Sequence, residues 1–163
     1  MEPGIGGTVV VNRQIVPGKH LYGGEFGLML IDGQSLSLVG TVVHLAERYN
    51  KIKNTNLSGQ EVLELAKQGD EVSSSEAKLM FQSLAKAIYN LQYSFDPEKF
   101  IIGGGVSKNP YFLEQLRKSI QELVKEVEFA PIVPEIVAAK FHNDANLIGA
   151  ANSFEQLKKV KSV

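Results

Sequence analysis

The chain has 163 residues, of which 44% are hydrophobic and 21% are charged, as expected for a globular protein with a packed core. Its formal net charge of −1 offers no general attraction for polyanions, so nucleic acid is not the expected partner. The absence of cysteine excludes disulfides and thiolate metal sites, and no apolar run is long enough to span a membrane. We therefore expect a cytoplasmic protein with no membrane partner.

The first third of the chain is predicted to form short antiparallel strands. Residues 8–11 and 14–16 are strand-like segments separated by Asn12-Arg13, a spacing that predicts a hairpin. A glycine-rich loop then leads to a third apolar strand at residues 28–31, which ends at the Asp32-Gly33 turn.

The middle of the chain has helical periodicity. Apolar residues recur at helical spacing from Leu38 to Tyr49, and capping-box patterns begin at Ser58 and Ser73. The helix that follows Ser73 should be the longest of the chain. Its expected buried positions are Met80, Leu84, Ile88 and Leu91.

Strands and helices alternate in the last third of the chain. Strands are predicted at residues 100–102 and 136–139, with a helix from Pro110 to about Val127 between them, and a last helix is capped by Asn143 or Asp144. Because a helix separates the two strands, they should be parallel. The element order predicts an α/β domain whose mixed sheet, antiparallel in its first three strands, is covered by helices.

Two glycine clusters are candidates for ligand binding. The first comprises Gly4, Gly6 and Gly7 with Thr8, and the second is Gly103, Gly104 and Gly105, placed between a strand and a helix. Backbone N–H groups attract phosphate oxygens, and a missing Cβ permits close approach. Neither cluster has the spacing of a P-loop or a Rossmann fingerprint, and tight turns without a ligand are the alternative.

Glu25 is the most informative carboxylate, because it lies among Gly23, Gly24 and Gly27. A carboxylate there could accept hydrogen bonds from two neighbouring sugar hydroxyls, and the alternative is a solvated turn glutamate. His20 could reach the same pocket or lie on a surface loop. The histidines show no paired spacing typical of a zinc site.

These segments together resemble the C-terminal half of the ROK family of bacterial repressors and sugar kinases. The stretch GIGGTVVVNRQIVPG is similar to the glycine loop and hairpin of the family, and GGEFG is similar to its sugar-binding element. DPEKFIIGGGVS resembles its strand and adenosine-binding loop, and FHNDANLIGAA resembles its last helix. The likeness covers nearly the whole chain in the same order.

The resemblance implies a ribonuclease-H-like, actin-like fold and phosphorylation of a hexose hydroxyl by ATP with magnesium. It places Gly4, Gly6, Gly7 and Thr8 near the ATP phosphates, Gly103–Gly105 near the adenosine, and Glu25 on the sugar. His20 is a second sugar-contact candidate only because it lies close before Glu25 in the sequence. It implies no resident metal site in this chain, because the cysteine-rich zinc loop of the family is replaced by SLSLVG and its usual histidine by Leu28. Pro3 also stands where the family has threonine.

The resemblance further implies that residues 1–163 form a single C-terminal lobe. The Asp-x-Gly-Gly-Thr phosphate loop and the aspartate base of the family belong to an N-terminal lobe that this sequence lacks. We therefore expect an isolated chain without kinase activity, which self-associates as a homo-oligomer, a dimer, through apolar surface. The alternatives are the effector-binding half of a ROK repressor and a degenerate dimerisation domain.

Overall fold

The computed structural model describes residues 4–141 and 148–149. The helices are α1 (Leu36–Gly40), α2 (Val42–Lys53), α3 (Gly59–Lys67), α4 (Glu71–Phe95) and α5 (Pro110–Glu126), with 3-10 turns η1 (Phe26–Leu28) and η2 (Gly105–Lys108). The strands are β1 (Val10–Val11), β2 (Gln14–Ile15), β3 (Leu30–Ile31), β4 (Gln34–Ser35), β5 (Phe100–Ile102) and β6 (Ile136–Ala138). The predicted last helix lies largely outside the described residues.

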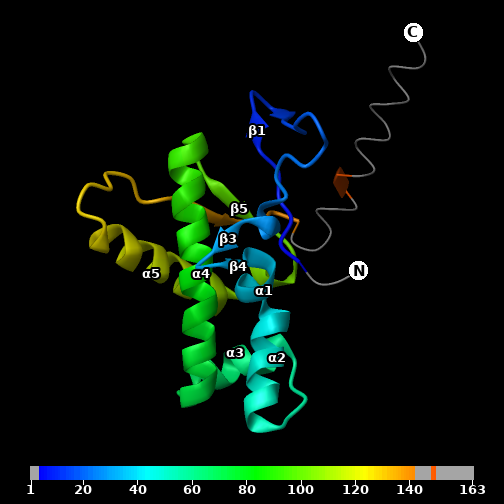
Figure 1. Cartoon of the computed structure of the whole chain (residues 1–163), viewed down its shortest axis with the longest axis vertical. Helices are drawn as coiled ribbons and strands as arrows, with labels where there is room; N and C mark the ends of the chain where they lie inside the picture. Colours follow the sequence, from blue (N-terminus) through cyan, green and yellow to red (C-terminus); the bar gives the residue numbers. More distant parts are fainter. Residues whose placement is uncertain (1–3, 142–147, 150–163) are drawn as a thin grey trace.

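Helix α4 is the central element, and the other helices pack along its length (Figure 1). Helices α2 and α3 lie at one end, whereas α5 crosses near the middle. Of the positions predicted to be buried on α4, Met80, Ile88 and Leu91 are buried and Leu84 is partly buried. Leu45 and Leu116 join the same core from α2 and α5, so the periodicity located the core face of α4 correctly.

Strands β5 and β6 are parallel, as the sequence predicts. Phe100 pairs with Ile136 and Ile102 pairs with Ala138. Phe100 and Ile102 pack on the core, while Ile101 between them is 64% exposed, which is the alternation of a half-buried strand. Asn109 then caps α5, because its side chain accepts from the Phe112 N–H and Pro110 takes the first helical position.

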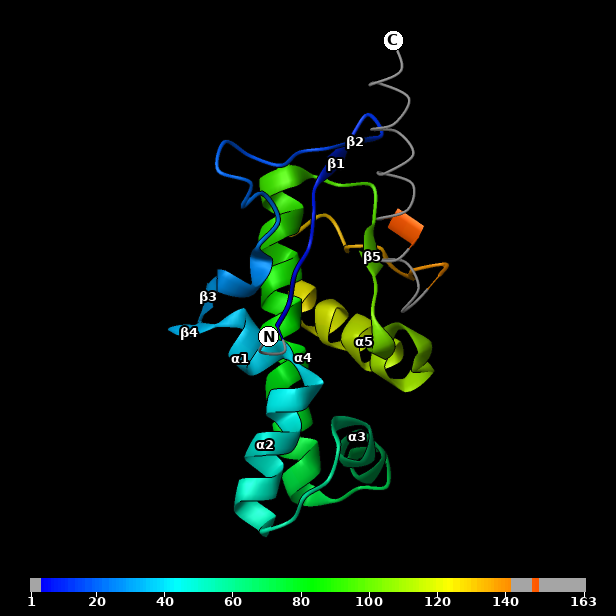
Figure 2. The ribbon, with the colours of Figure 1, turned by 90° about the vertical axis from the view of Figure 1, so that its right-hand side faces the viewer.

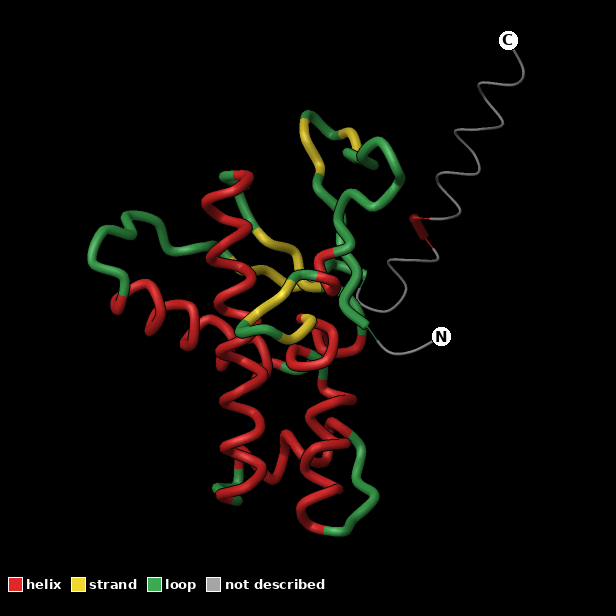
Figure 3. The backbone as a smooth tube through the Cα atoms, in the orientation of Figure 1, coloured by secondary structure: helices red, strands yellow, loops and turns green. Residues whose placement is uncertain are grey.

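The predicted antiparallel three-stranded arrangement is not found in the part of the chain that the structure describes. Strand β1 pairs antiparallel with β2, but β3 pairs with β4, so strands occur only as short pairs (Figure 3). Residues 16–29 separate the β1–β2 hairpin from β3. They form a glycine turn and the 3-10 turn η1, which packs against α1, so β3 does not continue the hairpin as a third strand.

Two predicted helix boundaries were wrong. The helix expected from Leu38 to Tyr49 is broken at Thr41, whose extended backbone and side-chain oxygen cap α2. Helix α4 begins at Glu71 with Asp70 as its cap, whereas Ser73 is buried inside the helix. In both cases a local cap, in which Thr41 accepts from the His44 N–H and Asp70 from the Ser73 N–H, sets a boundary that apolar periodicity does not encode. The capping box predicted at Ser58 is present.

Candidate functional site

The amino-terminal glycine segment, residues 4–8, lies directly against the loop that contains Glu25. A Cβ on Gly24 would lie 2.4 Å from the Gly7 carbonyl oxygen, and one on Gly27 would lie 2.2 Å from the Ile5 carbonyl oxygen. Gly24 also has φ +102°, a conformation that side chains rarely adopt. Two motifs separated by about 20 residues in the sequence are therefore packed backbone to backbone, and the glycines of the loop make that approach possible.

The same segment is anchored to α1 through Ile5. The Ile5 N–H donates to the Ser37 hydroxyl oxygen over 3.0 Å, and the Ile5 side chain packs beside Leu36 and Leu84. Figure 2 shows the segment rising from α1 towards the β1–β2 hairpin. The glycine segment is thus held from one side by a helix and from another by the Glu25 loop.

Glu25 itself is free to meet a ligand. It is exposed, it precedes η1, and its side chain makes no hydrogen bond or ion pair among the described residues. The Phe26 ring beside it lies 6.3 Å from the Phe95 ring at the end of α4, which ties the loop to the helical body. His20 is exposed in the preceding loop, and no contact joins it to Glu25 in the described part of the chain.

The triple glycine lies where β5 ends and η2 begins. Space is open where Gly103 and Gly104 would carry a Cβ, and Gly104 has φ +73°. Ser107 closes the turn, because its hydroxyl donates to the Gly104 carbonyl over 2.7 Å. Gly103 and Gly104 are exposed, so their backbone is accessible to a planar ligand.

The glycines of the first cluster have different tasks. A Cβ on Gly7 would lie 2.6 Å from the Phe26 ring, so Gly7 is needed for packing. At Gly6 there is open space, and this residue is exposed. Of the residues predicted to hold phosphates, Gly6 therefore offers the freest backbone, together with the exposed Thr8.

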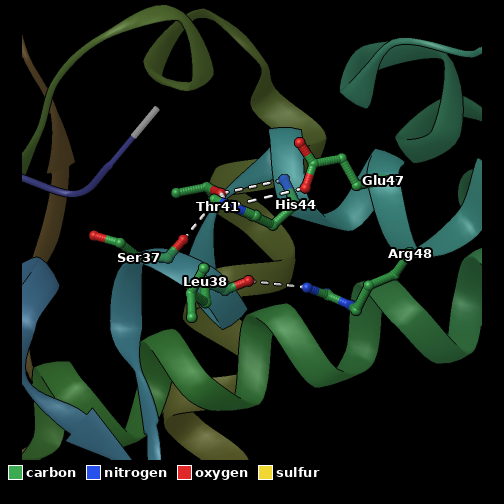
Figure 4. A network of polar contacts seen from close by, with 6 residues as sticks. All are labelled: Ser37, Leu38, Thr41, His44, Glu47 and Arg48. Carbon is green, nitrogen blue, oxygen red and sulfur yellow. Dashed lines mark hydrogen bonds and ion pairs between the residues drawn. The ribbon is translucent and has the colours of Figure 1, made fainter. Parts of the chain in front are cut away.

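A polar network beside the segment was missed by the sequence reasoning (Figure 4). Ser37 joins Ile5 to α1, and Thr41 donates from its hydroxyl to the Ser37 carbonyl over 3.1 Å. His44 is partly buried, and its Nδ1 lies 2.8 Å from the Thr41 hydroxyl. No local pattern marks Ser37, because its partner is 32 residues away in the sequence.

Arg48 is a second residue without a signal in the sequence. Its Nε lies 2.6 Å from a Glu76 carboxylate oxygen, and its Nη1 donates to the Leu38 carbonyl over 3.1 Å. These bonds link α2 to α4 and to α1, and Figure 4 shows Arg48 and Leu38 below Ser37 and Thr41. Glu76, predicted to close a capping box, instead neutralises this guanidinium, so its role is structural.

Exposed glycine backbone can approach phosphates and a flat base. No group of three His, Asp or Glu residues within residues 4–141 and 148–149 is placed to hold a metal ion. Across the same residues, no helix combines the length and apolarity needed to cross a bilayer.

A hollow of about 320 Å³ lies elsewhere, between β3, α4 and α5. It is lined by Asp32, Lys86, Tyr89 and Asn90, among others, and Asp32 forms an ion pair with Lys86 there. It contains none of the residues predicted to bind sugar or nucleotide.

Solved structures share this α/β fold. A ROK family protein from Streptococcus pneumoniae TIGR4, solved in complex with sucrose, superposes with a TM-score of 0.89 at 29% identity, over 96% of this chain and 56% of that one. A ROK family glucokinase from Streptomyces griseus, in complex with glucose and AMPPNP, gives a TM-score of 0.76 at 23% identity, over 91% of this chain and 56% of that one.

The ROK family model matches residues 1–156, and the chain belongs to the ROK family. A relative named beta-glucoside kinase, from Klebsiella pneumoniae, is 32% identical over 165 residues, which cover 94% of this chain and 53% of the relative. The chain thus spans about half the length of that curated relative. The family assignment predicted from the glycine motifs is confirmed.

Proposed function

We propose that this chain is the sugar- and nucleotide-binding part of a ROK-type sugar kinase. The observation that carries the proposal is the packing of the glycine segment 4–8 against the loop of Glu25, with the carboxylate itself exposed and unpaired. In such an enzyme the acceptor hydroxyl and the γ-phosphate must meet within reach of one another, and this contact brings the two binding elements together.

In this proposal Glu25 accepts hydrogen bonds from two neighbouring hydroxyls of a hexose or glucoside. The backbone of Gly6 and Thr8 faces the ATP phosphates, and Gly103–Gly105 lies along the adenosine. Phosphoryl transfer forms a bond from the sugar oxygen to the γ-phosphorus and breaks the bond to the β,γ-bridging oxygen. The proton of the attacking hydroxyl passes to a general base, which by family resemblance lies outside this chain. Magnesium would arrive with ATP and neutralise phosphate charge.

The relative named beta-glucoside kinase supports a glucoside or hexose as the substrate class. Without the base, the isolated chain should bind ligands but not turn them over, and steady ATP-dependent phosphorylation of a hexose by the chain would contradict this. Exposed apolar side chains on the hairpin, Val10, Val11 and Ile15, support self-association, and sedimentation as a monomer at high concentration would count against it.

Replacing Glu25 by glutamine tests the sugar assignment. The change keeps the size of the side chain but removes the charge, and hydrogen bonds to a charged group contribute about 1.5–3 kcal/mol. We expect the affinity for methyl β-glucoside, measured by calorimetry, to fall about tenfold or more.

The matched control is Glu122→Gln, which changes an exposed glutamate on α5 and should leave the affinity unchanged. Equal glucoside affinities for the original chain and Glu25→Gln, or no binding by the original chain, would refute the assignment.

A further inference from the structure

Ser37 stands at the point where the glycine segment, the Glu25 loop and α1 meet. Its hydroxyl oxygen accepts from the Ile5 N–H over 3.0 Å. The same oxygen would lie 2.2 Å from a Cβ on Gly27 and 3.3 Å from one on Gly4. One side-chain atom therefore lies against both candidate ligand-binding segments.

The backbone of Ser37 is itself held in place. Its carbonyl accepts from the Thr41 hydroxyl over 3.1 Å, on the side away from its own hydroxyl (Figure 4). The Thr41 oxygen also accepts from the His44 N–H and lies 2.8 Å from His44 Nδ1, where the histidine tautomer sets which atom donates. The cap of α2 and the anchor of the glycine segment are thus consecutive links of one hydrogen-bonded chain.

Apart from its close packing against the Glu25 loop, the segment has few other attachments among the described residues. Its glycines carry no side chains, and Gly6 has open space around it. Ile5 supplies the apolar anchor, beside Leu36 and Leu84, but an apolar contact fixes distance without fixing the orientation of a backbone. The hydrogen bond to Ser37 fixes the orientation of the Ile5 N–H, because N–H donors prefer nearly linear geometry.

We infer that Ser37 is a positioning residue, which fixes the orientation of residues 4–8 relative to the loop of Glu25. What this role means for ligand binding rests on the proposed function. In that proposal, Ser37 sets the separation between the backbone that faces phosphate and the carboxylate that holds the sugar. Removal of its hydroxyl should loosen that separation while the helical core stays folded.

The test is hydrogen–deuterium exchange of the chain carrying Ser37→Ala, Ser37→Thr or the control Ser74→Ala. Ser74 is a matched control, since its hydroxyl near the start of α4 also bonds the backbone, donating to the Ala66 carbonyl over 3.3 Å. We expect the Ile5 amide to exchange about fivefold faster in Ser37→Ala, the factor set by one ordinary hydrogen bond. Ser37→Thr keeps the hydroxyl and should restore slow exchange, and Ser74→Ala should not alter Ile5.

Unchanged Ile5 exchange in Ser37→Ala would overturn the inference. So would an equal acceleration at Leu45 and Leu116 in the core, because that would show general loss of stability. Methyl β-glucoside affinity separates this inference from the proposed function. If the original chain binds the glucoside, Ser37→Ala should weaken binding about fivefold, and unchanged affinity would also overturn the positioning role. If the original chain binds none, the proposed function fails, while exchange at Ile5 still decides whether Ser37 fixes the segment.

Discussion

Replacement of Gly24 by alanine is expected to separate the glycine segment from the Glu25 loop and to abolish glucoside binding. A Cβ there would lie 2.4 Å from the Gly7 carbonyl oxygen, and φ is +102°. Backbone strain of this kind costs about 1–3 kcal/mol, and forced overpacking costs about 1–3 kcal/mol more. We expect the free energy of unfolding to fall by about 2–4 kcal/mol, measured by urea denaturation alongside calorimetry with methyl β-glucoside.

Gly33→Ala is the matched control for this change. Gly33 also has a positive φ, +81°, but open space surrounds the position of its Cβ. The free energy of unfolding of Gly33→Ala should fall by the backbone strain alone, and this variant should keep glucoside binding. If Gly24→Ala and Gly33→Ala lost the same stability and both bound the glucoside normally, the close packing of the two segments would not matter for the site.

The second large effect concerns the core between α4 and α5. Leu116 is 1% exposed and belongs to the main core cluster, so Leu116→Ala should lower the free energy of unfolding by about 2–5 kcal/mol. The measurement is the midpoint of unfolding by urea, with the slope of the unfolding free energy against urea concentration unchanged. Leu79→Ala, on α4 but 40% exposed, should cost far less. A loss below about 1 kcal/mol for Leu116→Ala would mean that α5 does not pack on α4 as described.

The elements best predicted from the sequence are those specified by local chemistry. The cap at Asn109, the capping box at Ser58 and the buried face of α4 depend on residues within a few positions of one another. The parallel pairing of β5 and β6 followed from the helix between them. The family and the α/β fold could be predicted because several motifs occur along the chain in the same order as in the family.

What the sequence did not predict depends mostly on distant partners. The break at Thr41 is an exception, because its hydroxyl bonds the nearby Ser37 carbonyl and His44 N–H, which apolar periodicity does not register. Arg48 and Glu76 pair across 28 positions, and Ser37 meets Ile5 across 32. The approach of Gly24 to Gly7 was not predicted, since no periodicity encodes it. His20 was proposed as a sugar contact from its position before Glu25, and that assignment stays a prediction.

The central claim is that residues 4–8, Glu25 and Gly103–Gly105 face one ligand site. Backbone amide chemical shifts of the labelled chain, followed during titration with ATP and then methyl β-glucoside, test it most directly. We predict that ATP shifts the amides of Gly6, Thr8 and Gly104 with one dissociation constant, and that the glucoside then shifts Glu25. Shifts confined to Gly103–Gly105, or separate dissociation constants for the two glycine clusters, would contradict the claim.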